Sequence, residues 1–341
     1  MAVAPGFDNN LFNGDQKNQK ELADLLKDKK HPLLNRAISG LYPTGSTIKP
    51  IIAAAALQEK LISPNKKIYC KGKIIIPNKY HPDKPIIKRD WAAHGWTDIK
   101  KAIAESCDVY FYTIGGGYKD QTGLGPTKIK KYLDLFNWGS ETGIDLPGEL
   151  NGLIPSPEWK KRVKKTPWWD GDTYNLAIGQ GDILITPIQV AVAFAAIANG
   201  GTLYQPKIVK EIIDSEKKVF KKIEPAVIRK NFIDPQNLKI VREGMREAVT
   251  GENSPLASST LLKSLPVAVA AKTGTAETSR IGYYNNWIGV FAPYENPQIV
   301  LIVMIEDVHG LKPATLSVAR EVLDWYFRED FRQEEINRNQ N

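Results

Sequence analysis

The chain has 341 residues, of which 42% are hydrophobic and 25% are charged, and its formal net charge is +8. These proportions are ordinary for a folded protein, so they exclude disorder as the dominant state. Basic runs at 27–30, 160–165 and 217–222 fit either an anionic partner or a lysine-rich solvated surface. Phe220 is the one aromatic residue within these runs, and this scarcity favours the solvated surface and argues against a nucleic acid partner. No apolar run reaches the roughly 18 residues that a membrane-spanning helix needs, so we expect the chain as given to be soluble.

The first third of the chain predicts a strand, then a helix, then a second and more apolar helix. Residues 1–12 predict a short apolar strand that ends in a Gly/Asn/Asp turn, and 18–30 predict a weak polar helix. A turn-rich stretch from Gly40 leads into a predicted helix over about 47–60, rich in Ile and Ala. Pro50 fits there because amides of the first helical turn have no partner within the helix. The Pro-, Lys- and Asn-rich stretch 63–90 predicts a loop.

Helices dominate the middle of the chain and strands return near its end. The pattern predicts helices over 98–112, 126–136 and 187–199, the last capped by Thr186 ahead of Pro187. Residues 267–272 alternate like a strand, and the β-rich runs 286–291 and 299–305 flank a hairpin signal at 292–296. An amphipathic helix over 313–327 closes the pattern. We therefore expect a mixed α/β fold, one antiparallel sheet with a large helical insertion, and not a doubly wound parallel sheet.

A serine activated by lysine is the chemistry that the sequence favours. None of the four histidines lies in a nucleophile-elbow pattern, which argues against a Ser-His-Asp site. A Ser-x-x-Lys spacing places both side chains on one helix face. The chain shows this spacing three times, at Ser46/Lys49, Ser63/Lys66 and Ser215/Lys218.

Ser46 has the context that a nucleophile needs, although an ordinary helix N-cap explains a lone serine there equally well. It follows Pro-Thr-Gly and opens an apolar helix. The positive end of that helix would stabilise negative charge at the hydroxyl, and burial would lower the pKa of Lys49. The two other serines lie in polar or charged stretches without such a helix.

Two later motifs supply the groups that an acyl-transfer site also needs. Ser106 and Asp108 lie in a predicted helix and add a second hydroxyl and a carboxylate. Lys272-Thr273-Gly274-Thr275 ends a predicted strand, where Gly274 would let an extended substrate lie along the backbone. Lys272 with the hydroxyls of Thr273 and Thr275 would hold a substrate carboxylate.

In this order, Ser-x-x-Lys, Ser-x-Asp and Lys-Thr-Gly resemble the motifs of penicillin-binding proteins and serine β-lactamases. Longer stretches resemble the class B transpeptidases, most closely their elongation-specific penicillin-binding protein 2 branch. These stretches are 35–50, 142–147, 177–189 and 271–277. The second motif commonly ends in Asn, and Asp108 stands there in this chain. An ionised Asp108 can only accept hydrogen bonds, so we expect it to contact Lys49 or Lys272.

The resemblance implies a β-lactamase/DD-transpeptidase-like fold over 1–341. The sheet lobe would comprise about 1–45 and 265–341, and an all-helical lobe about 46–264. The family also has a membrane anchor, a pedestal domain and a preceding strand, and we expect this chain to be a transpeptidase domain without them. We expect the full-length protein at the periplasmic face of the cytoplasmic (inner) membrane.

The resemblance also implies an activity, crosslinking of peptidoglycan stem peptides during cell elongation. Ser46 would attack a D-alanyl-D-alanine carbonyl with Lys49 as general base, and the amides of Ser46 and Thr275 would form the oxyanion hole. Ser106 would relay a proton, no cofactor would be required for the chemistry, and β-lactams would acylate Ser46. Expected partners are the glycosyltransferase and scaffold membrane proteins of the elongation complex.

Two alternatives to this activity remain. One is hydrolysis of β-lactams or of D-Ala-D-Ala, which Pro147 disfavours because it stands where class A β-lactamases have a catalytic glutamate. The other is a scaffold in the elongation complex that binds without turnover.

A metal site is a further hypothesis. Cys70, Asp90, His94 and Cys107 form a donor set that suits tetrahedral zinc, although their spacing fits no standard zinc motif. Resembling penicillin-binding protein 2 members bind zinc at positions matching His94 and Cys107. Zinc would then be structural, stiffening the helix of Ser106. The alternatives are a disulfide or two ordinary thiols.

Overall fold

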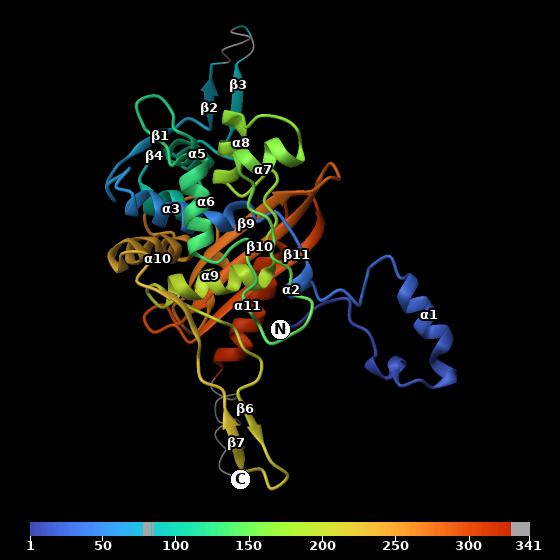
Figure 1. The fold of residues 1–341 in the computed structure, drawn as a ribbon. Coiled ribbons are helices and arrows are strands. Elements are labelled where there is room, and N and C mark those ends of the chain that lie inside the picture. The colour runs from blue at the N-terminus through green and yellow to red at the C-terminus, as the bar shows by residue number, and fades with distance from the viewer. Residues whose placement is uncertain (78–82, 84, 329–341) are drawn as a thin grey trace.

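The chain forms one three-stranded sheet and a larger, mainly helical part (Figure 1). The structure is a computed structural model that describes residues 1–77, 83 and 85–328. Its helices are α1 Gln19–Lys27, α2 Arg36–Ser39, α3 Lys49–Gln58, α4 Ile99–Ala104, α5 Asp108–Gly116, α6 Gly125–Leu135, α7 Pro157–Val163, α8 Asp170–Ala177, α9 Pro187–Ala198, α10 Pro235–Thr250 and α11 Ala314–Phe327. Its strands are β1 Ile68–Cys70, β2 Lys73–Ile76, β3 Ile86–Arg89, β4 Gly95–Thr97, β5 Thr202–Tyr204, β6 Glu211–Ile213, β7 Val219–Lys222, β8 Val227–Lys230, β9 Ala270–Glu277, β10 Tyr283–Ala292 and β11 Ile299–His309.

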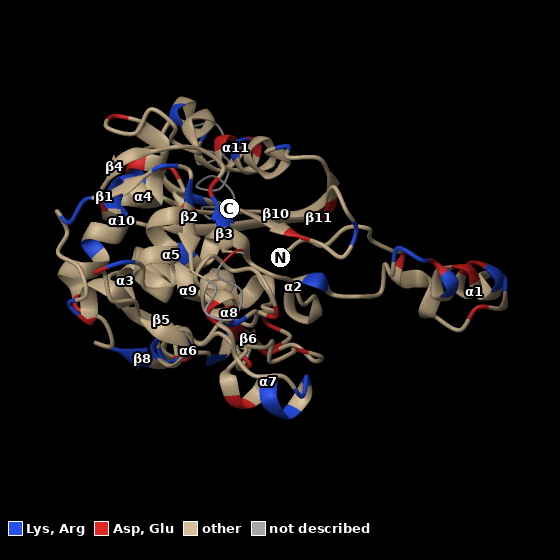
Figure 2. Cartoon of the chain, turned by 90° about the horizontal axis from the view of Figure 1, so that it is seen from above, with Lys and Arg blue, Asp and Glu red and all other residues tan. Residues whose placement is uncertain are grey.

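The main sheet is antiparallel, with strand order β11-β10-β9, so β9 is an edge strand. The predicted hairpin and the mixed fold class are confirmed. Figure 2 shows α11 on one side of this sheet and α9 on the other. Gly289 lets α9 approach closely, because a Cβ there would lie 2.6 Å from Cδ1 of the Phe194 ring. Ile288 and Val290 point the opposite way, into a second apolar cluster with α11.

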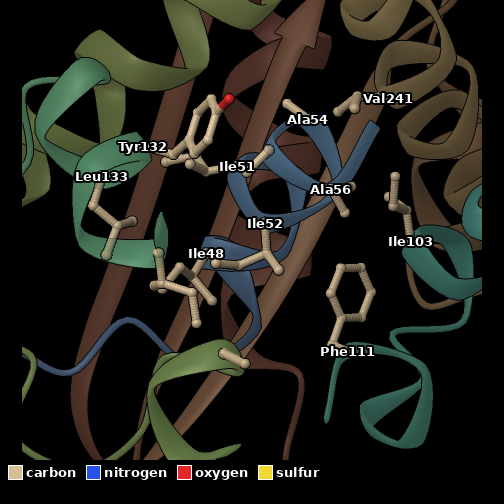
Figure 3. Close-up of a cluster of buried hydrophobic side chains, with 14 of the residues drawn as sticks. Ile48, Ile51, Ile52, Ala54, Ala56, Ile103, Phe111, Tyr132, Leu133 and Val241 are labelled. Atoms are coloured by element: carbon tan, nitrogen blue, oxygen red, sulfur yellow. The ribbon is translucent and has the colours of Figure 1, made fainter. Parts of the chain in front are cut away.

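Helix α3 is the centre of the main core. Every residue from Lys49 to Leu57 is buried. Figure 3 shows Ile51 beside Tyr132 of α6, and Ala54 beside Val241 of α10. The alanines of α3 have small side chains, so neighbouring helices can pack close to its backbone.

The strand predicted within 1–12 is wrong. Residues Asn9–Phe12 form a 3-10 helix, and the Asp8 side chain accepts a hydrogen bond from the Asn10 amide. Short polar side chains of this kind offer the backbone local bonds that compete with a sheet ladder. Residues 1–45 therefore add no strand to the main sheet, and Tyr42 makes only an isolated bridge to Ile185.

The all-helical description of 46–264 is also wrong, as is the loop predicted over 63–90. Among the described residues of this range there are four two-stranded sheets, which pair β1 with β4, β2 with β3, β5 with β8 and β6 with β7. The stretch 63–90 itself contributes β1, β2 and β3. Ile74 and Ile76 alternate with exposed residues, so β2 buries one face. The division of the chain into two lobes stays a prediction.

The N-terminal segment around α1 stands away from the body of the protein (Figures 1 and 2). None of the α1 residues is buried. Within the described part of the chain, we find no helix with the length and apolar character that crossing a membrane requires.

Candidate active site

Ser46 lies in the short 3-10 helix Gly45–Ile48 that leads into α3, and its neighbours Gly45 and Thr47 are buried while it is partly exposed. It is not a helix N-cap. Thr44 occupies the N-cap of the 3-10 helix and Ile48 that of α3, so the capping alternative for Ser46 is wrong. Ser46 is thus a partly exposed serine on a turn whose neighbouring residues are buried.

Glycines bring the Ser46 turn against the edge of β9. Gly45 has a φ of +50°, and a Cβ there would lie 2.9 Å from the Thr275 amide nitrogen. A Cβ on Gly274 would lie 2.8 Å from the Thr44 carbonyl oxygen. These contacts require glycine and place the backbone of Thr275 next to that of the Ser46 turn.

Lys49 is fully buried and donates three hydrogen bonds, none of them to Ser46 within the described residues. Its Nζ lies 2.6 Å from Asp108 Oδ1, 2.8 Å from the Ser106 carbonyl oxygen and 3.1 Å from Ser106 Oγ. The contact of Asp108 with a lysine is as expected from a carboxylate in the second motif. The Phe111 ring, 5.3 Å from Nζ, adds a cation–π contact.

Lys272 approaches the same serine from β9. Its Nζ lies 2.9 Å from Ser106 Oγ and 2.9 Å from the Thr273 carbonyl oxygen. Burial, followed by the positive charge of Lys49, holds the pKa of Lys272 well below its usual value. Ser106 Oγ therefore accepts hydrogen bonds from both amines, which leaves its own proton free to point elsewhere.

Ser106 does not lie within a helix, so the single helix predicted over 98–112 is wrong. Helix α4 ends at Ala104, α5 begins at Asp108, and Ser106 between them has a φ of +56°. A left-handed backbone costs a residue other than glycine about 1–3 kcal/mol, and such strain gathers at functional sites. The break turns the Ser106 hydroxyl toward the two amines.

The side chains of Cys70, Asp90, His94 and Cys107 converge beside this break. Their candidate ligand atoms all lie within 4.8 Å of one another. Asp90 Oδ2 is 3.4 Å from Cys70 Sγ and 3.3 Å from Cys107 Sγ, and its Oδ1 is 3.3 Å from His94 Nε2. Both cysteines are buried free thiols. Two thiols, an imidazole and a carboxylate fit tetrahedral zinc.

Glu105, which sequence reasoning missed, supports this cluster. Its Oε2 lies 2.7 Å from His94 Nδ1, the partner position that orients a metal-binding imidazole. The cluster also reaches the start of α5, because Asp90 accepts from the Val109 amide at 2.8 Å and Cys107 is the N-cap of α5. The four residues thereby fix the backbone on either side of Ser106.

The residues of the third motif, 272–275, alternate between the two faces of β9. Side chains alternate along a strand, so those of Thr273 and Thr275 project from the face of β9 opposite to that of Lys272. These threonines line a pocket of about 170 Å³ between β9, β10 and the start of α11. The free edge of β9 meets Gln180, whose Nε2 lies 3.3 Å from the Thr275 carbonyl oxygen. Gln180 lies in one of the long matching stretches, but no site role was predicted for it.

The other two Ser-x-x-Lys pairs lie away from this site. Ser63 and Ser215 are exposed, and Lys218 pairs with Glu216 at the surface. Within the described residues, neither Ser46 nor Ser106 has a histidine partner, and His81 lies outside them.

A partly exposed serine beside two buried lysines, at the edge of an antiparallel sheet, defines the serine–lysine class of active site. Residues 1–325 match the family model for the penicillin binding protein transpeptidase domain, and the chain belongs to this family.

Similar proteins agree with this placement. The chain is 33% identical to the peptidoglycan D,D-transpeptidase MrdA of Haemophilus influenzae, in a match covering 98% of this chain and 52% of the relative. The fold is similar to Pseudomonas aeruginosa PBP2 in complex with WCK 5153, with TM-score 0.79, 30% identity, and coverage of 96% of this chain and 71% of that one. It is also similar to Helicobacter pylori PBP2 in its complex with MreC, with TM-score 0.74, 30% identity, and coverage of 89% and 52%. The chain spans about half the length of the curated relatives it matches.

Proposed function

We propose that this chain is the catalytic domain of a peptidoglycan DD-transpeptidase of cell elongation. The observation that carries the proposal is the Ser106 hydroxyl, which accepts hydrogen bonds from two buried lysines next to the Ser46 turn. A hydroxyl held in this way suits proton transfer between a serine nucleophile and an amine leaving group.

In the proposed reaction, Ser46 Oγ forms a bond to the penultimate D-alanine carbonyl carbon of a stem peptide, with Lys49 as the base. The bond to the terminal D-alanine breaks, and the departing amine takes a proton through Ser106. An amine of a second stem peptide then attacks the ester, forms the crosslink and restores the serine. The amides of Ser46 and Thr275 are the proposed oxyanion hole, and the close approach of Gly45 to Thr275 supports that role.

Labelling by a fluorescent penicillin tests this proposal. Wild-type protein and Ser63→Ala, an exposed serine of the same spacing, are expected to label equally. Ser46→Ala is expected to lose the label, and mass spectrometry should place the adduct on Ser46. Equal labelling of Ser46→Ala would contradict the nucleophile assignment.

Hydrolysis is the competing activity, and the position of Glu149 argues against it. This carboxylate accepts from the Thr142 amide at 2.7 Å and from the Gly143 amide at 2.9 Å, so it is engaged in holding its own loop. We expect the penicillin adduct to persist for hours. An adduct that disappears within seconds would favour a β-lactamase, and a protein that forms none would favour the non-catalytic scaffold.

The proposed setting is the periplasmic face of the cytoplasmic membrane, reached through parts of the full-length protein outside this chain. One structural relative was solved in complex with MreC and another within a peptidoglycan synthase complex. By similarity we propose elongation-complex membrane proteins as partners. Co-purification of the full-length protein with such partners tests this.

We also propose that Cys70, Asp90, His94 and Cys107 hold a structural zinc ion. Their convergence on one buried point supports the assignment. Bound zinc would lock the start of α5 and take no part in the chemistry. Elemental analysis should find about one zinc per chain, falling in Cys107→Ser, while a zinc-free purified protein would contradict the proposal.

A further inference from the structure

Gln180 binds the free edge of β9 as a backbone peptide group would. Its Nε2 donates to the Thr275 carbonyl oxygen at 3.3 Å, and its Oε1 accepts from the Glu277 amide at 3.3 Å. Backbone groups of successive residues in an antiparallel strand point alternately to its two sides. Thr275 and Glu277 are two positions apart, so both present their N–H and C=O groups on the side of β9 away from β10. One side-chain amide therefore occupies two consecutive hydrogen-bonding positions of this edge.

The turn that carries Gln180 is anchored next to the Ser46 turn. The Gly45 amide donates to the Gly179 carbonyl oxygen at 2.9 Å, which connects the two turns. Gly179 and Gly181 have φ values of +73° and +82°, in the region that favours glycine. The backbone on both sides of Gln180 thus follows a path set by glycines. Its side chain is partly exposed and needs only a change of rotamer to leave the edge.

An extended acyl donor in antiparallel pairing with β9 would need the same positions. In the proposed oxyanion hole, the reactive carbonyl oxygen of the donor accepts from the Thr275 amide. Two residues that form a hydrogen-bonded pair of an antiparallel ladder exchange both of their N–H···O bonds. The residue that carries the reactive carbonyl would therefore donate its own N–H to the Thr275 carbonyl oxygen, to which Gln180 already donates. The donor residue two positions earlier would pair with Glu277, whose amide Gln180 also binds.

The two contacts of Gln180 decide between sharing and competition. The Thr275 carbonyl oxygen has two lone pairs and can accept from two donors. The Gln180 amide, however, bridges this oxygen to the Glu277 amide and so lies along the strip of edge that the donor backbone must cover. Pairing of the donor with β9 thus requires Gln180 to release the edge. A donor that brings an N–H to Thr275 replaces the hydrogen bond that is lost, and a donor without this N–H does not.

We propose that Gln180 is a specificity-determining residue that closes the β9 edge in the free enzyme and is displaced by the backbone N–H of the acyl donor. This inference rests on the proposed transpeptidase function. The contact lowers the fraction of enzyme whose edge is open, and the apparent affinity for an N–H donor falls by that fraction. Donors without the N–H bind beside Gln180 and do not pair with Thr275.

Acylation of Ser46 by two penicillins that differ in one group tests the inference. Benzylpenicillin carries an amide N–H on the carbon next to its β-lactam carbonyl, in the place of the N–H of the transferred residue, and its 6-acyloxy analogue has an ester oxygen there. Gln180→Met keeps the length of the side chain and removes both hydrogen bonds. We expect the second-order rate constant of acylation by benzylpenicillin to rise about 3- to 10-fold above wild type, as for the net contribution of one hydrogen bond. The ratio of the amide rate to the ester rate should rise by the same factor.

Gln121→Met is the matched control. The Gln121 Nε2 also donates to backbone carbonyl oxygens, those of Leu61 and Thr122, both at 3.0 Å, and neither residue belongs to the candidate site. The amide-to-ester ratio of this variant should match that of wild type. Gln180→Ala serves if Gln180→Met does not fold, and thermal unfolding shows whether each variant is folded. A merely structural Gln180 would give lower rates with both penicillins in these variants, because β9 would lose its connection to the glycine turn.

The outcomes separate the inference from the proposed function. Wild-type protein that neither penicillin acylates at Ser46 would overturn the function and the inference with it. Acylation of wild type together with an unchanged or lower amide-to-ester ratio in the folded Gln180 variants would overturn only the inference. A rise of the same size in Gln121→Met would also overturn it, because the effect would then not depend on the β9 edge.

Discussion

At the scale of single residues, the Ser106 hydroxyl oxygen accepts two hydrogen bonds from lysine side chains. Amines from α3 and β9 both donate to its oxygen, at 3.1 and 2.9 Å, so its own proton must leave along a third direction. Ser106 is partly exposed and lies in the break between α4 and α5, not on a helix face. Its strained backbone is the geometric condition for this arrangement.

We expect Ser106→Ala to slow penicillin acylation by about 10²- to 10³-fold, within the range for loss of a proton-transferring group. Ser46 remains, so the adduct should still form on it, only more slowly. Stopped-flow acylation rates measure the effect, with Ser215→Ala in the exposed β6–β7 turn as control. A rate within twofold of wild type would remove Ser106 from the proton path.

The pKa of Lys272 predicts a pH dependence of stability. Burial lowers this pKa, so between the native and the ordinary values the unfolded chain binds more protons than the native one. Stability should therefore rise with pH across that window and fall as pH falls through it, by at most about 1.4 kcal/mol per pH unit. Urea unfolding of wild type and Lys272→Met at several pH values measures this. Parallel stability curves for the two proteins would contradict it.

At the scale of elements, α3 connects the core to the Ser46 turn. Its residues from Lys49 to Leu57 are buried, so each truncation leaves a cavity. Ile52→Ala should lower the free energy of unfolding by about 2–5 kcal/mol. Leu26→Ala on the exposed α1 is the control and should change it by less than about 0.5 kcal/mol. A similar cost in both would show that α3 is not the centre of the core. Chemical denaturation with a constant m-value provides the measurement.

Elements were predictable from sequence where local signals decide them. Thr186 and Pro187 mark the start of α9 correctly because capping is a local interaction. The break at Ser106 was not predictable, since it depends on Asp90, which binds the Val109 amide from 19 positions away. The helical pattern of residues 98–112 does not indicate that contact, because Asp90 lies outside this stretch.

In the candidate site, too, some residues could be predicted from local sequence patterns and others could not. Its motif residues have fixed linear spacings and could be found from the sequence. Gln180 and Glu105 belong to no such spacing, and their positions follow only from tertiary packing. The joint role of Lys272, Thr273 and Thr275 on one carboxylate stays a prediction.

At the scale of the whole molecule, Arg36 connects the segment before α2 to the body of the protein. Arg36 donates to the carbonyl oxygens of Lys30 and His31, at 2.7 and 3.0 Å, and pairs with Glu306 of β11 at 2.6 Å. No residue of 1–28 is buried, whereas Ile38, shortly after Arg36, is 1% exposed. The attachment therefore begins near Lys30 and not within the α1 segment.

Tolerance to truncation should change sharply at that point, since it depends on the burial and hydrogen bonding of the removed backbone. We expect removal of 1–28 to shift Tm by no more than about 2 °C and to leave penicillin labelling of Ser46 unchanged. Removal of 1–39 takes away Arg36 and Ile38 and should lower Tm by several degrees, as loss of a buried apolar side chain does. Thermal unfolding and labelling of both truncations decide the matter. Loss of labelling in the shorter truncation would mean that the α1 segment contacts the catalytic body.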